Sequence, residues 1–475
     1  MRTIPAAALT EAVAALCIEA NTRLPADVQA ALDAARAAEP WPLARNTLDL
    51  LWSNLGAARE AGLPICQDTG MACVFVELGT EVHIEGDFEA AIHEGVRRGY
   101  TDGYLRKSIV ADPLRRGNTG DNTPAAITVH LVNGDGCQVT VAPKGFGSEN
   151  MSRIAMLKPA DGVEGFKRFV VDTVQQAGSN PCPPVILGVG VGGSFDKVAY
   201  LAKKALLRPW TSPTPTPITP PSSGSCWRRS TPSASGRRAS AGVPPAWAWP
   251  SSRCPPTWPA CRPRSTSPAM SPAGPRRNCK GGRLMEYKLT APCTAADLAP
   301  LRAGDTVLLS GVVYTARDQA HKRMMEALDA GEALPFPLEG SAIYYVGPTP
   351  ERPGQVIGSA GPTTSGRMDS MSPRLLDLGN KIMIGKGKRD AAVKAAVRRN
   401  GAVYLAALGG AGALMARSVR SLEVIAWPDL GCEAVRRLEV TDMPLTVILD
   451  SAGGDLYESG PAAYLASRQG PGPAL

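Results

Sequence analysis

Apolar residues recur every three or four positions over residues 5–62, and this spacing predicts helices. The apolar face of the first helix consists of Ala7, Leu9, Val13, Leu16 and Cys17. Because Cys17 lies on that face, we interpret it as a small core residue. A further helix, near residues 47–61, leads into a loop. Beyond the loop, the apolar run 71–78 predicts a strand and the amphipathic pattern of 88–98 predicts another helix.

Shorter patterns continue towards the middle of the chain. Residues 126–132 and 138–141 predict the two strands of a hairpin around a glycine-containing turn. A helix is predicted at 162–177. The run 185–191 predicts a strand, which a glycine turn joins to a helix over 195–207. Such a strand, turn and helix unit can bind an anion in principle.

From residue 285 to residue 464 strand and helix patterns alternate, which is typical of a layered α/β domain. The predicted strands include 286–289, 304–309, 312–314 and 342–346. Helices are predicted over 295–301 and 316–328. Met285, where this order begins, looks like the initiator methionine of a second polypeptide.

Residues 209–283 interrupt the pattern. They are saturated with Pro, Ser, Arg and Thr, yet they hold five of the eight tryptophans, Trp210, Trp227, Trp247, Trp249 and Trp258. Disordered linkers are poor in aromatic residues, whereas folded domains need an apolar periodicity that is missing here. We therefore interpret the segment as translated in a wrong reading frame. Joining the third base of each codon to the first two of the next is compatible with D-E-P-H-P-D-P-Y-Y-A for 210–219, and with H-L-A-G-L-P and V-T-C-H-V-A within 256–272.

The net charge of +8 by itself suggests a nucleic-acid or anionic partner. The charge is concentrated, however, because residues 209–283 contain no Asp or Glu and eleven basic residues. Removing these eleven positive charges from the total leaves a net −3 for the rest of the chain. The body of the protein is therefore mildly acidic. Nucleic-acid binding through the interleaved Arg and aromatic residues of this segment is kept as an alternative class of function.

The 11 cysteines are scattered without repeated close spacing, which does not indicate a disulfide framework. No apolar run approaches the roughly 20 residues of a membrane span, and the N-terminus lacks the apolar core and cleavage site of a signal peptide. We expect a cytoplasmic protein without a membrane or nucleic-acid partner, in which thiols are buried, catalytic or metal-bound.

Two cysteines lie in loops bounded by helix-breaking residues. Cys66 follows Pro64 and precedes Gly70, so we expect an exposed loop from which the side chain can reach a ligand or metal. Cys182 is flanked by prolines in a second rigid loop. A third such cysteine appears only in the reconstructed frame. Three thiolates suit a cubane iron–sulfur cluster with one iron open to substrate, although a single loop cysteine can also be inert.

Basic side chains in the C-terminal half could neutralise carboxylates. Arg317 and Arg367 offer bidentate forks, and Lys386 offers a point charge. Glycines within 144–150 leave backbone amides free to cradle an anion, although a plain turn is the more common reason for such glycines. Arg317 could instead belong to a surface ion pair, and Thr363 could be only a helix cap.

Five motifs occur in an order that resembles one family. They are C-Q-D-T-G at 66–70, N-P-C-P-P at 180–184 followed by G-V-G-V-G-G-S, Y-T-A-R-D-Q-A-H-K-R at 314–323, G-P-T-T-S-G-R-M-D at 361–369 and I-G-K-G-K-R-D at 384–390. Together they resemble class I, iron–sulfur-dependent fumarate hydratases, of which the two-subunit form has separate α and β chains. The resemblance implies an α/β fold with an α-subunit-like, helical plus α/β iron–sulfur hydro-lyase domain over 1–208. An unstructured, frame-shifted segment would follow over 209–284, and a swivelling β/β/α-type, β-subunit-like domain over 285–475.

The resemblance also implies roles for single residues. Cys66 and Cys182 match two of the three ligands of a [4Fe–4S] cluster, whose open iron acts as a Lewis acid. The family's substrate-site positions fall on Gln67, Asp68, Arg106, Gly147, Arg317, Thr363, Arg367 and Lys386. Thr363 resembles the base that takes the C3 proton of malate, with Asp68 assisting and Arg367 supplying a nearby cation.

The implied reaction is the reversible hydration of fumarate to (S)-malate, carried out on a small dicarboxylate in a homo-oligomer or an α2β2-like assembly. A hydro-lyase for L-tartrate or mesaconate is the closest alternative, and an electron carrier is a further class. The family's third cluster cysteine and a substrate-contacting histidine belong to the replaced segment, where Cys254, Cys261 and Cys279 have different surroundings. The chain as given is therefore predicted to lack a complete cluster site.

Overall fold

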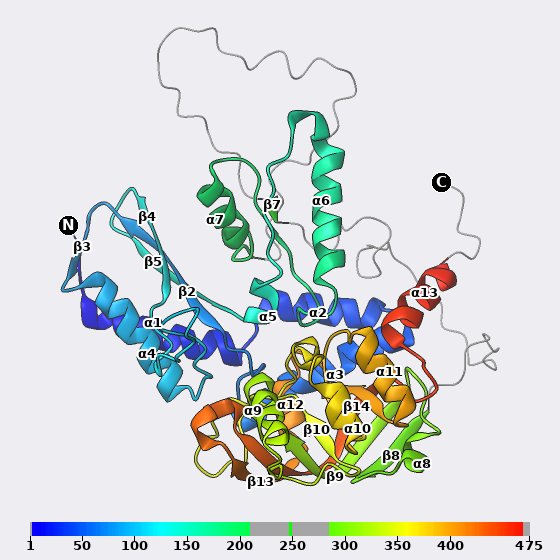
Figure 1. Cartoon of the computed structure of the whole chain (residues 1–475). Coiled ribbons are helices and arrows are strands. Elements are labelled where there is room, and N and C mark those ends of the chain that lie inside the picture. The colour runs from blue at the N-terminus through cyan, green and yellow to red at the C-terminus, as the bar shows by residue number, and fades with distance from the viewer. Residues whose placement is uncertain (1, 210–246, 249–284, 469–475) are drawn as a thin grey trace, which may run out of the picture. The chain divides into compact units, whose positions relative to one another are not determined.

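The computed structural model describes residues 2–209, 247–248 and 285–468. The predictions for the segment 209–284 therefore lie outside the described residues, apart from positions 209 and 247–248. The chain forms two compact units, whose helices and strands are labelled in Figure 1. The first consists of Met1–Leu24, Pro40–Pro183 and Pro275–Leu475, and the second of Pro25–Glu39 and Pro184–Gly274.

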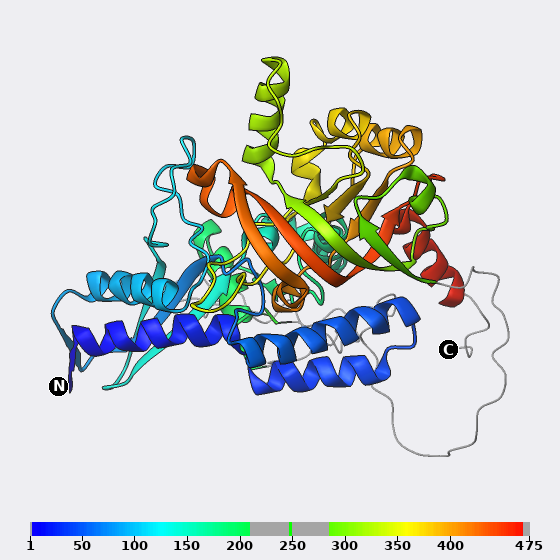
Figure 2. The same ribbon diagram turned by 90° about the horizontal axis from the view of Figure 1, so that it is seen from below.

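In the first unit, two helices lie side by side and cover a small sheet. These are α1 (Ala6–Thr22) and α4 (Phe88–Asp102), as the helical spacing predicted (Figure 2). Their apolar faces pack against strand β2 (Met71–Gly79) in one core cluster. Cys17 is fully buried in that cluster, so its interpretation as a core residue is confirmed. The short strands β1 (Arg2–Pro5) and β3 (Val82–Glu85) pair with each other in parallel.

Strands β4 (Ala126–Val132) and β5 (Cys137–Lys144) do not form the predicted hairpin. Strand β2 lies between them, parallel to β4 and antiparallel to β5. The connection between β4 and β5 crosses the end of β2 at Gly79, where a Cβ atom would lie 2.2 Å from the carbonyl oxygen of Gly134. Of the three strands, β2 is the most deeply buried, so burial of its apolar side chains favours the central position.

Three further helices of the first unit come from its N-terminal half. They are α3 (Pro42–Ala61), the short α5 (Phe146–Glu149) and α6 (Gly162–Ala177), preceded by the 3₁₀ turn η1 (Pro159–Asp161). Both α3 and α6 confirm helices expected from the sequence. Helix α3 ends at Gly62, whose φ of 63° provides the left-handed C-terminal residue that a glycine adopts without strain.

The second unit contains helix α2 (Ala26–Ala38), strand β6 (Gly188–Val189), helix α7 (Phe195–Ala205) and strand β7 (Trp247–Ala248). The strand expected over 185–191 is reduced to the two residues that find an antiparallel partner in β7. The helix expected after it is present. It packs closely on β6, because a Cβ atom at Gly188 would lie 2.1 Å from the carbonyl oxygen of Ala202.

The C-terminal part of the first unit is built on a seven-stranded mixed sheet in the order β13-β14-β12-β11-β10-β9-β8. Its strands are β8 (Glu286–Ala291), β9 (Thr306–Thr315), β10 (Ala342–Tyr344), β11 (Ile382–Gly385), β12 (Val403–Ala406), β13 (Val419–Ala426) and β14 (Val435–Leu449). Its helices are α8 (Ala295–Leu298), α9 (Asp318–Asp329), α10 (Ser372–Asp377), α11 (Ala391–Arg399), α12 (Gly412–Arg417) and α13 (Leu456–Arg468). Two 3₁₀ segments, η4 (Ser365–Met368) and η5 (Pro428–Glu433), complete it.

Strand pairing in this sheet closes on itself. β9, β10, β11 and β12 run parallel, and the long strand β14 pairs antiparallel with both β12 and β9. The sequence predicted two separate strands over 304–309 and 312–314, but β9 is continuous. Gly311 stays within it at a φ of 95°, opposite an irregularity in β14, so the glycine bends the strand instead of ending it.

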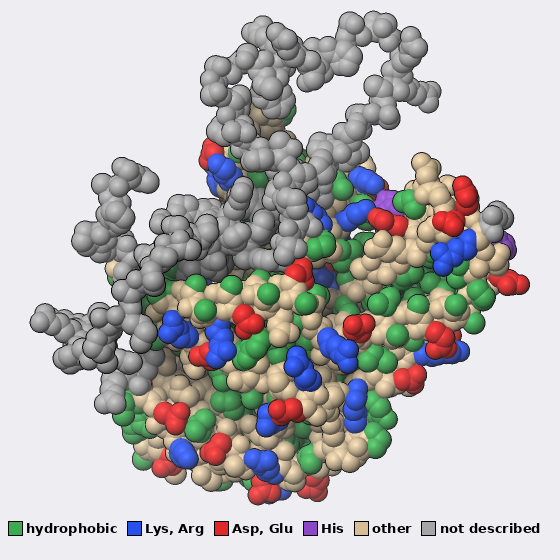
Figure 3. All heavy atoms as spheres, turned by 180° about the vertical axis from the view of Figure 1, so that it is seen from behind, with side chains coloured by type: hydrophobic (Ala, Val, Ile, Leu, Met, Phe, Trp, Pro, Cys, Tyr) green, Lys and Arg blue, Asp and Glu red, His purple; other side chains and the backbone are tan. Residues whose placement is uncertain are grey.

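Helices cover both sides of the sheet, so this part is a layered α/β structure as predicted. One core cluster joins the strands to residues of α3 and α12, and a second lies under α9, α10 and α11. Among the described residues, no helix combines the length and apolar character needed to cross a membrane. Figure 3 shows basic and acidic side chains interspersed over one face, in keeping with a body that is not strongly basic.

Candidate functional site

The segment from Pro64 to Gly70 is a loop, as predicted, but it is not exposed. The side chains of Gln67 and Thr69 are almost fully buried. The C-terminal part of the unit covers them: Gln67 Nε2 donates to the carbonyl oxygen of Pro362 at 3.1 Å, and Ser359 donates to the carbonyl oxygen of Pro64. At Gly70 a Cβ atom would lie 2.1 Å from the carbonyl oxygen of Lys144, which explains the glycine.

Asn54, in helix α3, fixes this loop to the C-terminal part. Its Nδ2 donates to the carbonyl oxygens of Ile65 and Gly410, both at 3.0 Å, and its Oδ1 accepts from the amide of Leu414 at 2.8 Å. The side chain is fully buried and its amide is fully used. Sequence reasoning missed this residue. The signal was a polar residue on the apolar face of α3, three positions after Leu51.

The two loop cysteines meet. The thiols of Cys66 and Cys182 hydrogen-bond to each other, and Lys386 Nζ lies 3.3 Å from Cys182 Sγ. The bond from Cys66, aided by the Lys386 ammonium, lowers the pKa of Cys182 to about 6. The same bond, together with burial, raises the pKa of Cys66. Lys386 also donates to the carbonyl oxygen of Asn180 at 3.0 Å, so it anchors the Cys182 loop.

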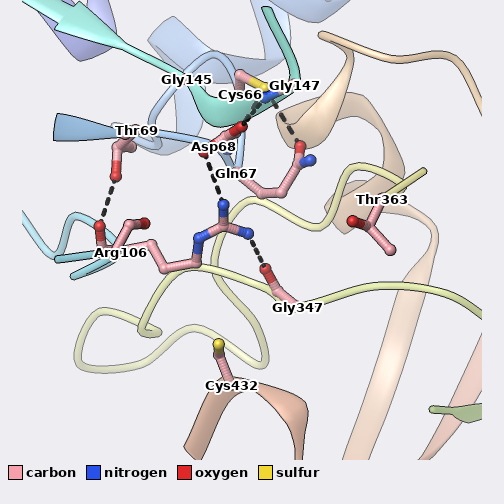
Figure 4. A network of polar contacts seen from close by, with 12 residues as sticks. Cys66, Gln67, Asp68, Thr69, Arg106, Gly145, Gly147, Gly347, Thr363 and Cys432 are labelled. Carbon is pink, nitrogen blue, oxygen red and sulfur yellow. Dashed lines mark hydrogen bonds and ion pairs between the residues drawn. The ribbon is translucent and has the colours of Figure 1, made fainter. Parts of the chain in front are cut away.

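Asp68 and Arg106 form a partly buried ion pair next to Cys66 (Figure 4). Arg106 Nη2 lies 2.8 Å from Asp68 Oδ1, and its Nη1 donates to the carbonyl oxygen of Gly347 at 3.0 Å. The amide of Gly147 donates to Asp68 Oδ2 at 3.4 Å. In the part of the chain that the structure describes, Asp68 makes no hydrogen bond to Thr363, the residue that it was expected to assist.

Arg317 is a buried cation and not a surface residue. Its Nη2 lies 3.2 Å from Glu433 Oε1, and its Nη1 lies 3.9 Å from Cys432 Sγ. Burial, the largest single influence, lowers the pKa of Arg317, but the neighbouring groups, Glu433 first among them, together outweigh it and the pKa is raised. The backbone of Gly347 approaches closely, because a Cβ atom there would lie 2.4 Å from Arg317 Nη1. Glu433 gave no signal in the sequence, since its partner lies 116 positions earlier.

Thr363 and Arg367 are in direct contact. Arg367 Nη2 donates to Thr363 Oγ1 at 2.5 Å, and its Nη1 lies 3.3 Å from Asp318 Oδ2. The residue at the start of η4 is Thr364, and its side chain makes no capping hydrogen bond, so Thr363 is not a helix cap. The amide of Thr363 donates to the carbonyl oxygen of Tyr345 at 2.8 Å, which fixes its position beside strand β10.

The Thr363 and Lys386 segments are joined to each other. The amide of Ser365 donates to the carbonyl oxygen of Lys386 at 2.8 Å. Beneath them lies the fully buried guanidinium of Arg389, 2.6 Å from Asp369 Oδ1 and between the rings of Tyr345 and Tyr404. The sequence contained Arg389 in a motif but gave it no role. Its aromatic and carboxylate partners come from segments too distant for any local pattern to show.

We tested whether these residues fit the expected iron–sulfur cluster. Cys66 and Cys182 suit two corners, and Gly409 leaves room beside them, since a Cβ atom there would lie 3.1 Å from Cys182 Sγ. No group of three or more Cys, His, Asp or Glu side chains able to hold a metal occurs among the described residues. Cys66 and Cys182, predicted as two of three ligands, therefore lie together, and the described part of the chain brings no third metal-binding side chain to them.

Two family models match the chain, one after the other. The model described as fumarate hydratase matches residues 10–220, and the model described as fumarase C-terminus matches residues 264–460. The chain belongs to the class I fumarate hydratase family. Members of this family are hydro-lyases, so the chain is an enzyme of that class.

Some relatives of this fumarate hydratase family member match most of it as one chain, and others match it as two separate subunits. The aerobic class I fumarate hydratase of Escherichia coli K12 is 28% identical over 459 residues, which cover 85% of this chain and 81% of the relative. Fumarate hydratase 2 of Leishmania major is 29% identical over 470 residues, covering 86% and 78%. The putative L(+)-tartrate dehydratase subunits alpha and beta of Methanocaldococcus jannaschii are 39% and 41% identical. The match to the alpha subunit covers 42% of this chain and 72% of that subunit. The match to the beta subunit covers 37% of this chain and 92% of that subunit.

Proposed function

We propose that this hydro-lyase catalyses the reversible hydration of fumarate to (S)-malate. The observation that carries the proposal is the contact between Arg367 and Thr363, in the same unit as three further cations, Arg106, Arg317 and Lys386. A C4 dicarboxylate carries two negative charges, and guanidinium groups bind carboxylates in a bidentate manner. The guanidinium and ammonium groups of the site therefore offer hydrogen-bond donors for both ends of such a substrate.

In the dehydration direction, Thr363 removes the C3 proton of malate. A neutral hydroxyl is a poor base, so Thr363 must act as an alkoxide, and the Arg367 donor at 2.5 Å is placed to stabilise that negative charge. Removal of the proton moves charge onto the neighbouring carboxylate of the substrate. Arg317 and Lys386 would offset this charge without having to move, because their partners already hold them in place. The electron pair on C3 then forms the C2–C3 double bond as the C2–O bond breaks, and the hydroxide that leaves takes the proton from Thr363, which gives water and restores the alkoxide.

The residues on the thiol side hold other parts of the site in place. Asp68 holds Arg106 towards Gly347, and Gln67 closes the loop against Pro362. We further propose that Cys66, Cys182 and a third thiolate hold a [4Fe–4S] cluster, which when bound supplies a Lewis acid for the substrate hydroxyl. We also propose a helical plus α/β hydro-lyase domain over 1–208, a swivelling domain over 285–475, a cytoplasmic location, and a homo-oligomeric or α2β2-like assembly.

The second candidate function is dehydration of L-tartrate, which is favoured by the identities of 39% and 41% to the putative tartrate dehydratase subunits. The deciding experiment is anaerobic reconstitution with iron and sulfide, followed by assays with (S)-malate, L-tartrate and 2-methylmalate. We expect iron-dependent turnover of malate and fumarate in the protein with a restored reading frame. Iron-dependent turnover of tartrate alone would replace the proposal by the second candidate, and no turnover of any of them would end both.

A further inference from the structure

Asp318, at the start of helix α9, lies between two of the substrate-site arginines. Its Oδ2 is 3.3 Å from Arg367 Nη1, and its Oδ1 is 3.8 Å from Arg317 Nε. That Oδ1 atom is buried and accepts no hydrogen bond within the described ranges of the chain, and Arg317 Nε is likewise buried without a hydrogen-bond partner there. The carboxylate therefore acts on Arg317 by charge alone, but it binds Arg367 directly.

The Arg367 guanidinium is held through two of its nitrogens, Nη1 and Nη2. A guanidinium is planar and its donors have a fixed geometry, so fixing Nη1 also fixes the direction of Nη2. Asp318 holds Nη1, and Nη2 donates to Thr363 Oγ1. The side chain of Arg367 is 43% exposed, so without the carboxylate little else would restrain it.

We propose that Asp318 is a positioning residue that keeps Arg367 on Thr363 while the substrate's carboxylates are bound. The inference rests on the proposed function, in which Arg367 stabilises the Thr363 alkoxide. A bound dicarboxylate attracts the same guanidinium and would pull it away from Thr363. The Asp318 carboxylate opposes that pull, at the expense of neutralising part of the positive charge that attracts the substrate.

Each of the three arginines of the site is then paired with its own carboxylate. Asp68 holds Arg106, and Glu433 holds Arg317. Asp318 completes the set for Arg367. The carboxylate that contacts the arginine of Thr363 thus belongs to the C-terminal half of the chain, whereas the resemblance pointed to Asp68. The inference concerns how the base is supported and leaves the identity of the base unchanged.

The test is the substitution Asp318→Asn, which keeps the size and a hydrogen-bond acceptor but removes the charge. We expect the variant to bind (S)-malate more tightly, by roughly threefold to tenfold, because one partly screened negative charge beside the cations is gone. We expect turnover by the reconstituted protein to fall by about tenfold or more, because Arg367 is no longer held on Thr363. KM and kcat would therefore both fall, a combination that general destabilisation does not produce.

A second variant separates charge from position. Asp318→Ala removes the acceptor as well as the charge, so we expect it to keep the tighter binding while kcat falls at least as far as in Asp318→Asn. The matched control is Asp429→Asn, because Asp429 pairs with Arg323 of the same helix α9 at 2.5 Å but its side chain is 60% exposed. We expect that control to leave the dissociation constant of malate, KM and kcat unchanged.

Binding is measured by calorimetry on the full chain as it is, and turnover on the reconstituted protein with a restored frame. The inference is overturned if folded Asp318→Asn binds malate no more tightly than the parent, or if its kcat is unchanged. Turnover of L-tartrate alone, with the same split between KM and kcat, would overturn the proposed function but support the role of Asp318. Failure of the parent protein to bind any of the tested dicarboxylates would overturn both.

Discussion

The two sides of the site are held in different ways. On the C-terminal side, Thr363, Arg367 and Lys386 belong to segments that bond to one another above a core of their own, with Arg389 beneath. On the thiol side, the Cys66 loop and Arg106 depend on partners far along the chain, such as Gly347 and Gly410. The cationic side is therefore preorganised by local packing, whereas the thiol side acquires its geometry only when the C-terminal part is folded against it.

The largest expected effect concerns the incomplete thiol side. The chain as given should retain little iron after reconstitution and gel filtration, because the described residues supply only two cluster ligands. A chain with the frame of 209–284 restored should retain iron and sulfide, and turnover should differ by at least roughly 10³-fold. Iron analysis and visible absorption measure the cluster directly. In the restored chain Cys182→Ser should lose iron, whereas Cys137→Ser should keep it; equal iron in the given and restored chains would contradict the interpretation.

Replacing Arg389, the buried cation on the C-terminal side, should lower the free energy of unfolding. Arg389→Met leaves the Asp369 carboxylate without its partner, and breaking a buried ion pair from one side costs about 3 to 5 kcal/mol. The exposed pair of Arg374 with Asp329 provides the control, because Arg374→Met should cost less than about 1 kcal/mol. Denaturant unfolding of both variants measures the difference. Equal stabilities would show that the C-terminal side is not held by this network.

The pH dependence of stability offers a third test on the same side. Burial lowers the pKa of His321 to about 4, and its Nδ1 contacts the carbonyl oxygen of Arg317 at 2.9 Å. Between pH 6.5 and pH 4 the unfolded chain binds a proton that the folded chain does not, so stability should fall as the pH is lowered through this window. The loss should reach about 3 kcal/mol and stop below pH 4.

The measurement is the denaturation midpoint against pH for the parent and for His321→Asn. The variant should lose the part of the slope that belongs to His321, while carboxylates that titrate in the same range contribute equally to both proteins. Parallel curves would mean that folding does not lower the pKa of this imidazole.

The smallest expected effect comes from weakening the contact between the Cys66 loop and the C-terminal part. Asn54→Leu removes three hydrogen bonds that connect the Cys66 loop to Gly410 and Leu414, and should cost roughly 2 kcal/mol. Asn54→Asp should be worse, because a carboxylate would face two carbonyl oxygens. Hydrogen exchange at the Leu414 amide reports the local loss. Asn118→Leu, in an exposed loop, is the control, and unchanged exchange at Leu414 in the Asn54 variants would contradict the comparison.

The sequence was informative wherever a pattern is local. Helical spacing identified α1, α3, α6 and α7, and motifs brought together residues that do lie in one unit, such as Cys66 with Cys182. It failed where a choice depends on distant partners. The hairpin was wrong because β2, a strand some fifty residues earlier, lies between β4 and β5. Asn54, Glu433 and Arg389 were missed because their partners are separated from them by segments that no short pattern spans.

The double pairing of β14 has a consequence for how the chain is made. Until residues 435–449 leave the ribosome, the ten-residue backbone edge of β9 that faces β14 has no neighbour, and such an open edge invites association with other chains. The last strand, β14, thus completes the sheet of the nascent domain. A polypeptide released before it should aggregate, whereas one that ends soon after it has every strand of the ring paired.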